Sequence, residues 1–141
     1  MKVTFFGHSD APEEIKSDLK SLIISLIDNY NANIFYVGNK GNFDLLVIKV
    51  LAETAKTYSG IKYRVVLSEL PSGTNKDYLN SETVFPAELA AVPKKFAIDR
   101  RNMWMVENSD IVVTYVKRTF GGAAKFKSTA EKKGKIVINI V

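Results

Sequence analysis

The chain has 141 residues, of which 46% are apolar and 25% charged, and its net charge is +5 at pH 7; this predicts one soluble globular domain over residues 1–141. It has no cysteine and a single histidine, which excludes disulfides, thiolate metal sites and a histidine-rich zinc site, so we expect no metal and no cofactor. No apolar run approaches the roughly 20 residues of a membrane span and no secretory leader precedes the first predicted strand, so we expect a cytoplasmic protein without a membrane partner.

The first half of the chain predicts two strands, each followed by a helix. Residues 2–6 (KVTFF) and 33–37 (NIFYV) are the predicted strands,. Asp10 is expected to cap a long amphipathic helix that reaches Tyr30, with a proline in its first turn. Asn42 is expected to cap a second helix, whose inward face would include Leu45.

The second half predicts three further strands and two further helices. Residues 62–67, 110–116 and 135–140 are the predicted strands, and residues 97–108 and 122–133 the predicted helices,. Between them lies a long irregular stretch over residues 68–96, in which residues 85–89 are expected to form a short turn of helix.

This alternation predicts the α/β class. Continuous apolar strands separated by helices are typical of a parallel sheet that is covered on both faces. We expect a Rossmann-like three-layer α/β/α sandwich with a five-stranded parallel sheet in the spatial order 3-2-1-4-5. A flavodoxin-like order, 2-1-3-4-5, is the alternative; the long break between strands 3 and 4 favours the first order, because there the chain must return across the sheet.

Three glycine-containing turns would meet at the carboxyl edge of such a sheet, where ligands bind in open parallel sheets. Helix N-termini present unpaired amides and a positive dipole, and the net positive charge also favours anions. We therefore predict a phosphate site at these turns, together with two arginines that begin the third helix. The predicted ligand-binding residues are Gly7, His8, Ser9, Gly38, Asn39, Lys40, Gly41, Arg100, Arg101, Thr119, Gly121 and Gly122.

Several of these residues have simpler explanations. His8 is either a donor to phosphate or ribose, or a loop histidine that bonds nearby backbone. Arg100 and Arg101 are either bidentate anion clamps or members of surface salt bridges to Glu88 or Asp99. No catalytic residue is predicted, because the chain has neither a G-x-S-x-G elbow nor a P-loop.

Residues 68–96 would pass over or beside this edge of the sheet. A long irregular segment in a small domain is usually functional, so we predict a lid over the ligand. Tyr78 and Phe85 are its candidate stacking groups, with packing onto the domain as the alternative.

Four ordered motifs carry a resemblance to a known family: FFGHSDAPEEIK, FYVGNKGNFD, FAIDRRNMWMVENSDIVVTYV and GGAAKFKSTAEKKGKIVINI. Together they resemble the YpsA-like branch of the SLOG superfamily, which unites the DNA-processing protein DprA (Smf) with the LOG phosphoribohydrolases. The resemblance implies a Rossmann-like domain that binds nucleotides or nucleotide derivatives, and a homodimer is compatible with it. It also implies that the pocket is formed by residues 7–9, 100–102 and 119–124.

Two departures from the family pattern bear on function. Ser9 stands where many relatives carry a basic residue. Ser128 stands where the LOG motif P-G-G-x-G-T-x-x-E places its glutamate, and a hydroxyl cannot replace a carboxylate as acid or base. This weakens the expectation of an enzyme, although Asp44, Glu107 or the more distant Glu131 remain as carboxylates.

Three functions follow from the sequence. The first is binding of a nucleotide or nucleotide derivative by a sensor-like or carrier-like domain. The second is N-glycosidase or phosphoribohydrolase activity on nucleoside monophosphates. The third is single-stranded DNA binding, as the DprA resemblance suggests, which needs a basic groove with exposed aromatic side chains.

Overall fold

Strands that are apolar on both faces pair here into a single parallel sheet. The computed structural model describes residues 1–70 and 82–141. The spatial order of the strands is β4-β3-β2-β1-β5-β6, and every neighbouring pair is parallel. The strands are β1 (Lys2–Gly7), β2 (Ile34–Val37), β3 (Lys62–Val66), β4 (Thr83–Val84), β5 (Ile111–Tyr115) and β6 (Ile136–Asn139).

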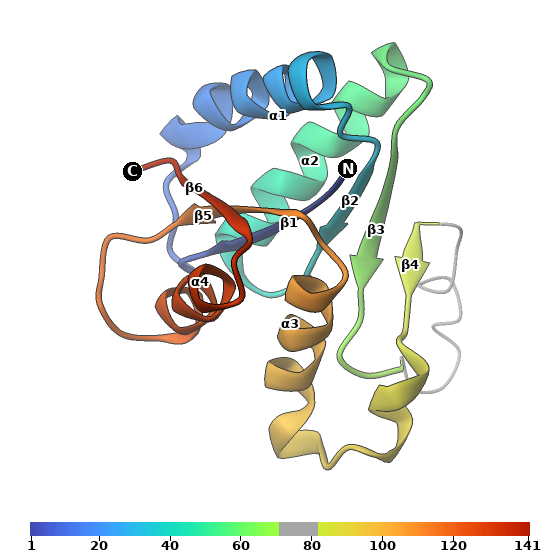
Figure 1. Ribbon diagram of the computed structural model, residues 1–141, viewed down its shortest axis with the longest axis vertical. Helices are drawn as coiled ribbons and strands as arrows, with labels where there is room; N and C mark the ends of the chain where they lie inside the picture. The colour runs from blue at the N-terminus through green and yellow to red at the C-terminus, as the bar shows by residue number, and fades with distance from the viewer. Residues whose placement is uncertain (71–81) are drawn as a thin grey trace.

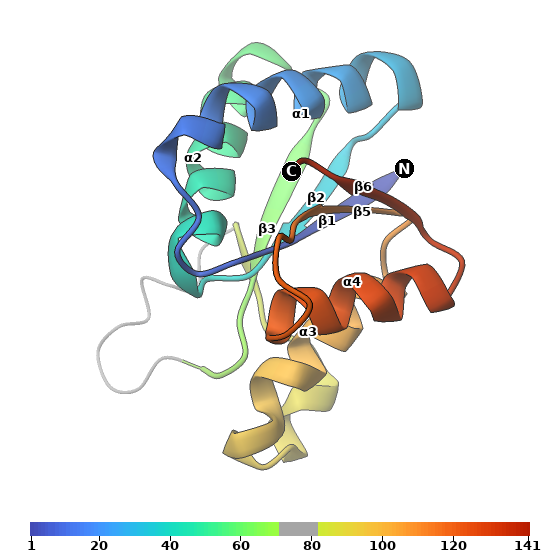
Figure 2. The ribbon, with the colours of Figure 1, turned by 90° about the vertical axis from the view of Figure 1, so that its left-hand side faces the viewer.

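Helices cover both faces of this sheet. They are α1 (Lys16–Tyr30), α2 (Gly41–Thr57), α3 (Ala97–Glu107) and α4 (Gly122–Lys132), with short 3-10 helices η1 (Glu13–Ile15), η3 (Ala87–Ala91) and η4 (Lys94–Phe96). The pair α1 and α2 lies on one face and the pair α3 and α4 on the other (Figures 1 and 2). Among the described residues, no helix combines the length and apolarity that crossing a membrane requires.

The predicted Rossmann-like order is confirmed. The five expected strands are β3, β2, β1, β5 and β6 in space, so β1 and β5 are neighbours, with Val3 opposite Ile111 and Gly7 opposite Tyr115. The difference is a sixth, two-residue strand: β4 extends the edge of the sheet by pairing with β3. It arises from the stretch that was expected to be irregular.

Two hydrophobic clusters hold the layers together, one on each face of the sheet. Alternation along β1 decides which cluster each side chain joins: Phe5 packs with α1 and α2, and Phe6 with α3 and α4. Phe5 stacks on Phe35, and Phe6 stacks on Phe126 with ring centroids 5.5 Å apart. Both faces are thus filled, which leaves the strand ends as the place for a site.

The predicted starts of α3 and α4 are confirmed, whereas those of α1 and α2 are wrong in detail. Asp10 caps no helix: α1 follows η1, and the residue at its N-cap is Ile15. Asn42 lies inside α2, whose N-cap is Lys40. The inward face of α2 also differs from the expected one: Leu46 and Val47 are buried, whereas Leu45 is 53% exposed.

The described part of the predicted lid contains β4, η3 and η4. The expected turn of helix at residues 85–89 is displaced to Ala87–Ala91. Phe85 is half-buried and lines a cavity with Leu70 and Leu89, whereas Tyr78 lies outside the described residues.

Candidate functional site

A pocket of about 270 Å³ opens where β1 and β5 end side by side. We call it the rim pocket, and it is lined by Gly7, His8, Ser9, Arg118, Phe120, Gly121, Gly122 and Ala123. Its walls come from the turn after β1 and from the loop that joins β5 to α4. This is the point at which the direction of the strand order reverses, where ligands of doubly wound sheets bind.

His8 joins the two walls of the rim pocket. Its backbone amide donates to the carbonyl oxygen of Tyr115 at 3.3 Å. Its Nε2 atom accepts hydrogen bonds from the backbone amides of Lys117, at 2.9 Å, and Arg118, at 3.3 Å. The side chain therefore fixes the start of the β5–α4 loop. This agrees with the second alternative for His8, a loop histidine that bonds backbone groups.

These two hydrogen bonds require a neutral imidazole. A nitrogen that accepts from two amides carries no proton, so the ring proton sits on Nδ1. Burial lowers the pKa of His8, as does the nearby Arg118 guanidinium, while Asp10 opposes them. The loop is thus held by the form of histidine that dominates at neutral pH.

The N-terminus of α4 faces the rim pocket without a side-chain cap. Gly121, at the N-cap, has φ of +95° and ψ of 175°, a conformation that is essentially restricted to glycine,. In the described part of the chain, the amides of residues 119–124 have no hydrogen-bond acceptor; the first such bond runs from Lys125 to the Gly121 carbonyl, at 3.0 Å. A Cβ atom at Gly121 or Gly122 would meet no atom within 4 Å. These amides are free to bind an anion.

Two further side chains shape this pocket. Arg118 forms an ion pair with Asp10 across the opening. Phe120 leaves 69% of its surface exposed beside the glycine pair, which is unusual for a phenylalanine. Thr119 is exposed but does not line the pocket.

The other glycine turn, residues 38–41, is closed. The Lys40 amide donates to Asp44 Oδ2 at 3.0 Å, and the Asn42 amide donates to the Ser9 carbonyl at 2.8 Å. Gly41 has φ of +89°, and a Cβ there would lie 2.7 Å from the Ser9 Cα. This turn packs against the first one and leaves no room for a phosphate.

An inner cavity of about 100 Å³ adjoins the rim pocket, since both are lined by Gly7, Gly122 and Ala123. Its polar lining comes from Lys40, Asp44, Arg101 and Asn102. Four elements meet there: the end of β1, the start of α2, the middle of α3 and the N-terminus of α4.

Arg101 and Asp44 form the buried polar centre of this cavity. Arg101 is 2% exposed, and its Nη1 atom donates to the Val66 carbonyl at 2.9 Å and to Asn39 Oδ1 at 3.2 Å. Its Nε atom donates to Asn102 Oδ1 at 2.8 Å. The guanidinium therefore ties α3 to the carboxyl ends of β2 and β3.

The electrostatics of Asp44 follow from its position. Burial raises the pKa of its carboxyl to about 6, although the Lys40 amide and the Arg101 guanidinium act in the opposite direction. Desolvation is the largest cause, because the charged form loses water and gains only one backbone hydrogen bond. Asp44 is thus a carboxyl whose pKa of about 6 lies well above its usual range, in the cavity that adjoins the rim pocket.

The two arginines of α3 point in different directions and line different pockets. Arg101 points into the sheet edge, whereas Arg100 is exposed and lines a different pocket, between α3 and α4. Asp99, considered as an arginine partner, pairs instead with Lys125 at 2.8 Å. Successive helical residues point about 100° apart, so a pair adjacent in sequence cannot act as one clamp.

The carboxylates considered for hydrolysis also separate. Ser128 is exposed on α4. Glu107 ends α3 next to the amino end of β5, opposite the rim pocket, and Glu131 bonds Lys127 near the far end of α4. Asp44 alone among the carboxylates considered lines the inner cavity. The described residues contain no group of three or more metal-ligating side chains.

Of the predicted residues, those of the first and last turns line the rim pocket, apart from Thr119. Lys40 and Arg101 line the inner cavity, and Gly38 and Asn39 lie next to Arg101. Gly41 packs against Ser9, and Arg100 lines neither of these two pockets. Asp44 and Arg118 line these pockets but were not among the predicted ligand-binding residues, and Asn102, Phe120 and Ala123 were included only through the ranges that the family resemblance implies. For Phe120, the adjacent glycine pair was a weak sequence indication that the ring would be exposed. For Asp44, no sequence indication existed, because its position depends on where α2 begins.

Comparisons with known proteins give the fold. No family model and no curated protein matches the chain. The structure is similar to that of DNA processing protein A (DprA) from Streptococcus pneumoniae, with a TM-score of 0.71 and 16% identity over 96% of this chain and 48% of that one. It is also similar to that of DNA processing protein A from Helicobacter pylori, with a TM-score of 0.70 and 16% identity over 97% of this chain and 63% of that one. That structure is described with the single-stranded DNA binding mode of the Helicobacter pylori protein. The chain therefore spans about half to under two thirds of these proteins.

Proposed function

We propose that this protein binds the phosphate of a nucleotide or nucleotide derivative in the rim pocket. The observation that carries the proposal is the open start of α4: amides without acceptors, a glycine pair without steric cover and the positive end of a helix dipole face one pocket. Each feature favours an oxyanion. The family resemblance of the sequence is in agreement.

The surroundings suit the rest of a nucleotide. Phe120 offers an exposed ring on which a base can stack,. The inner cavity offers a carboxyl at Asp44 and an amide at Asn102 to ribose hydroxyl groups. Arg118, whose partner Asp10 is itself exposed, can exchange that carboxylate for a phosphate,.

Position 122 offers a sharp test. Proline is tolerated at the first position of a helix, so Gly122→Pro removes one amide donor from the pocket, while Gly122→Ala adds a Cβ and keeps the amide. Calorimetric titration with adenosine monophosphate, adenosine diphosphate and ADP-ribose should show binding to the wild type and to Gly122→Ala. Loss of one charge-assisted hydrogen bond should weaken binding to Gly122→Pro by about tenfold. Equal affinity of the two variants, or no heat with any of the three ligands, would contradict the proposal.

Single-stranded DNA is the second candidate, favoured by the exposed ring of Phe120, which follows the exposed cationic residues Lys117 and Arg118 in the β5–α4 loop. Fluorescence anisotropy with a labelled oligothymidylate should then show affinity that falls steeply with salt, and Phe120→Ala should weaken it. Binding of the oligonucleotide without binding of any mononucleotide would replace the first candidate by the second.

The glycosidase alternative needs one further measurement. Incubation with nucleoside monophosphates, followed by chromatography, detects release of free base. Release that disappears in Asp44→Asn would make the protein an enzyme, with Asp44 as its carboxyl group.

A further inference from the structure

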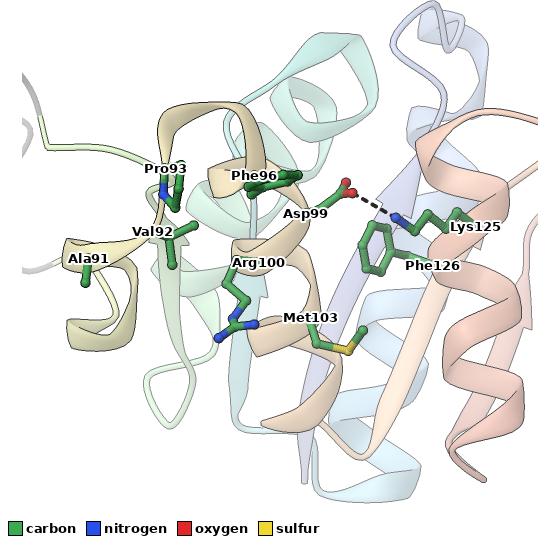
Figure 3. Close-up of a pocket in the computed structure, with 9 residues that line it drawn as sticks. All are labelled: Ala91, Val92, Pro93, Phe96, Asp99, Arg100, Met103, Lys125 and Phe126. Carbon is green, nitrogen blue, oxygen red and sulfur yellow. Dashed lines mark hydrogen bonds and ion pairs between the residues drawn. The ribbon is translucent and has the colours of Figure 1, made fainter.

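A second pocket, of about 440 Å³, lies between α3 and α4 and shares no lining residue with the rim pocket or the inner cavity (Figure 3). We call it the outer pocket. It is lined by Ala91, Val92, Pro93, Phe96, Asp99, Arg100, Met103, Lys125 and Phe126. Its volume is within the range of small-molecule sites, which hold about 300–1,000 Å³.

The lining of the outer pocket is largely apolar. Phe96 is 53% exposed although it is a large hydrophobic side chain, and Phe126 is buried in the floor. Met103 adds a flexible, polarizable side chain that packs well against aromatic rings. In Figure 3, Phe96 and Met103 lie at two levels along α3, and Phe126 lies across from them on α4. Such a surface suits a flat aromatic group.

The charges of this pocket leave one cation unmatched. Lys125 Nζ bonds Asp99 Oδ2 at 2.8 Å, so these two charges compensate each other. Arg100 is exposed, and its guanidinium lies on the side of α3 away from Lys125 (Figure 3). In the part of the chain that the structure describes, no hydrogen bond or ion pair occupies its guanidinium. The Lys95 ammonium, 5.1 Å from the centre of the Phe96 ring, adds to the positive potential.

We propose that the outer pocket binds a small aromatic monocarboxylate, with its ring on Phe96 and Met103 and its carboxylate on Arg100. Arginine binds carboxylates with two parallel hydrogen bonds, and Arg100 is the lining cation that has no ion-pair partner among the described residues. This site is independent of the proposed nucleotide function.

The test uses a matched pair of probes on the whole chain. Isotope-labelled protein is titrated with 2-naphthoate and with the neutral 2-naphthalenemethanol, and amide resonances are followed by NMR. The naphthoate should shift the amides of Val92, Asp99, Met103 and Phe126. Because a charge-assisted hydrogen bond is lost, the alcohol should bind about tenfold more weakly.

Two variants and one control separate charge from packing. Arg100→Gln should bring the affinity for naphthoate down to that for the alcohol, while Arg64→Gln, the same change outside all of these pockets, should leave both affinities unaltered. Phe96→Ala should weaken both ligands. The amide spectrum of each variant shows whether the fold is kept.

Three results would overturn the proposal. They are no binding of either probe, equal binding of both in the wild type, or shifts confined to the amides of the rim pocket such as Gly7 and Gly122. Shifts confined to the rim pocket would also show that the rim pocket accepts aromatic anions. Absence of binding of both probes would leave the nucleotide proposal unaffected.

Discussion

Two glycine turns precede helices at the same edge of the sheet, and they are used in opposite ways. In the turn before α2, a Cβ at Gly38 would lie 2.8 Å from Asp44 Oδ2, and one at Gly41 would lie 2.7 Å from the Ser9 backbone. In the turn before α4, the space around Gly121 and Gly122 is empty. The first turn uses its glycines for close packing, and the second uses them to leave amides accessible. Glycine in a strand-to-helix turn therefore predicts a phosphate site only where no neighbouring element packs against the turn.

The largest expected effect is on the free energy of unfolding, and it distinguishes steric crowding from backbone strain at the two glycine turns. Gly41 and Gly121 both have positive φ, so alanine strains the backbone at either position. Gly41→Ala should lower the free energy of unfolding by about 4 kcal/mol, because strain and overpacking add, and Gly121→Ala by about 2 kcal/mol, from strain alone. Urea denaturation measures both values. Equal losses would show that the two turns do not differ in packing.

The next effect concerns the closed turn and its buried arginine. Arg101→Met should cost about 3 kcal/mol of stability, because the carbonyl of Val66 and the carboxyl of Asp44 lose their cationic neighbour,. The pKa of Asp44 should then rise above its value of about 6, as carbon-13 NMR of the carboxyl can record. Arg101→Lys, which keeps the charge, is the control and should leave that pKa nearly unchanged.

The open turn should respond to pH through His8. Its pKa is lowered in the fold, so the unfolded chain takes up the proton first; the stabilisation is complete above about pH 6.5 and is lost as the pH falls from there toward the folded pKa. Two amide hydrogen bonds are at stake, so we expect a loss of about 1–2 kcal/mol. Faster amide exchange at Lys117 and Arg118 should accompany it.

A variant isolates this contribution from that of Asp44. The raised pKa of Asp44 acts in the opposite direction, reducing stability as the pH rises between about 4 and 6,. His8 is the single histidine of the chain, so the difference between the wild type and His8→Gln reports on it alone. A difference that stays constant between pH 5 and 8 would show that the protonation of His8 does not control the loop.

The smallest effect is expected at the mouth of the open turn. Arg118 and Asp10 are both partly exposed, so Arg118→Gln should leave the melting temperature almost unchanged. Nucleotide affinity should fall by about fivefold, since one phosphate contact is lost. The same substitution at Arg64, on β3, is the control; equal losses at both positions would point to a general effect of charge.

The strand order and the convergence of the turns could be predicted from the sequence, because apolar runs and helix periodicity are local and right-handed crossovers leave few topologies. The starts of α3 and α4, at Ala97 and Gly122, could also be predicted, whereas those of α1 and α2 could not. Asp10 and Asn42 have the side chains of helix caps, but capping competes with hydrogen bonds to distant residues. Here Asp10 pairs with Arg118. At the start of α2, Asp44 and the Ser9 carbonyl accept the hydrogen bonds of the backbone amides.

By itself the sequence determined the class of the fold, the parallel sheet with β1 beside β5, and the edge at which glycine turns gather. Only the tertiary structure decided which turn stays open, that Arg100 and Arg101 face different pockets, and that an aromatic pocket lies between α3 and α4. The physical reason is that hydrogen-bond patterns along a segment are set by nearby residues, whereas empty space and unmatched charge depend on how distant segments pack.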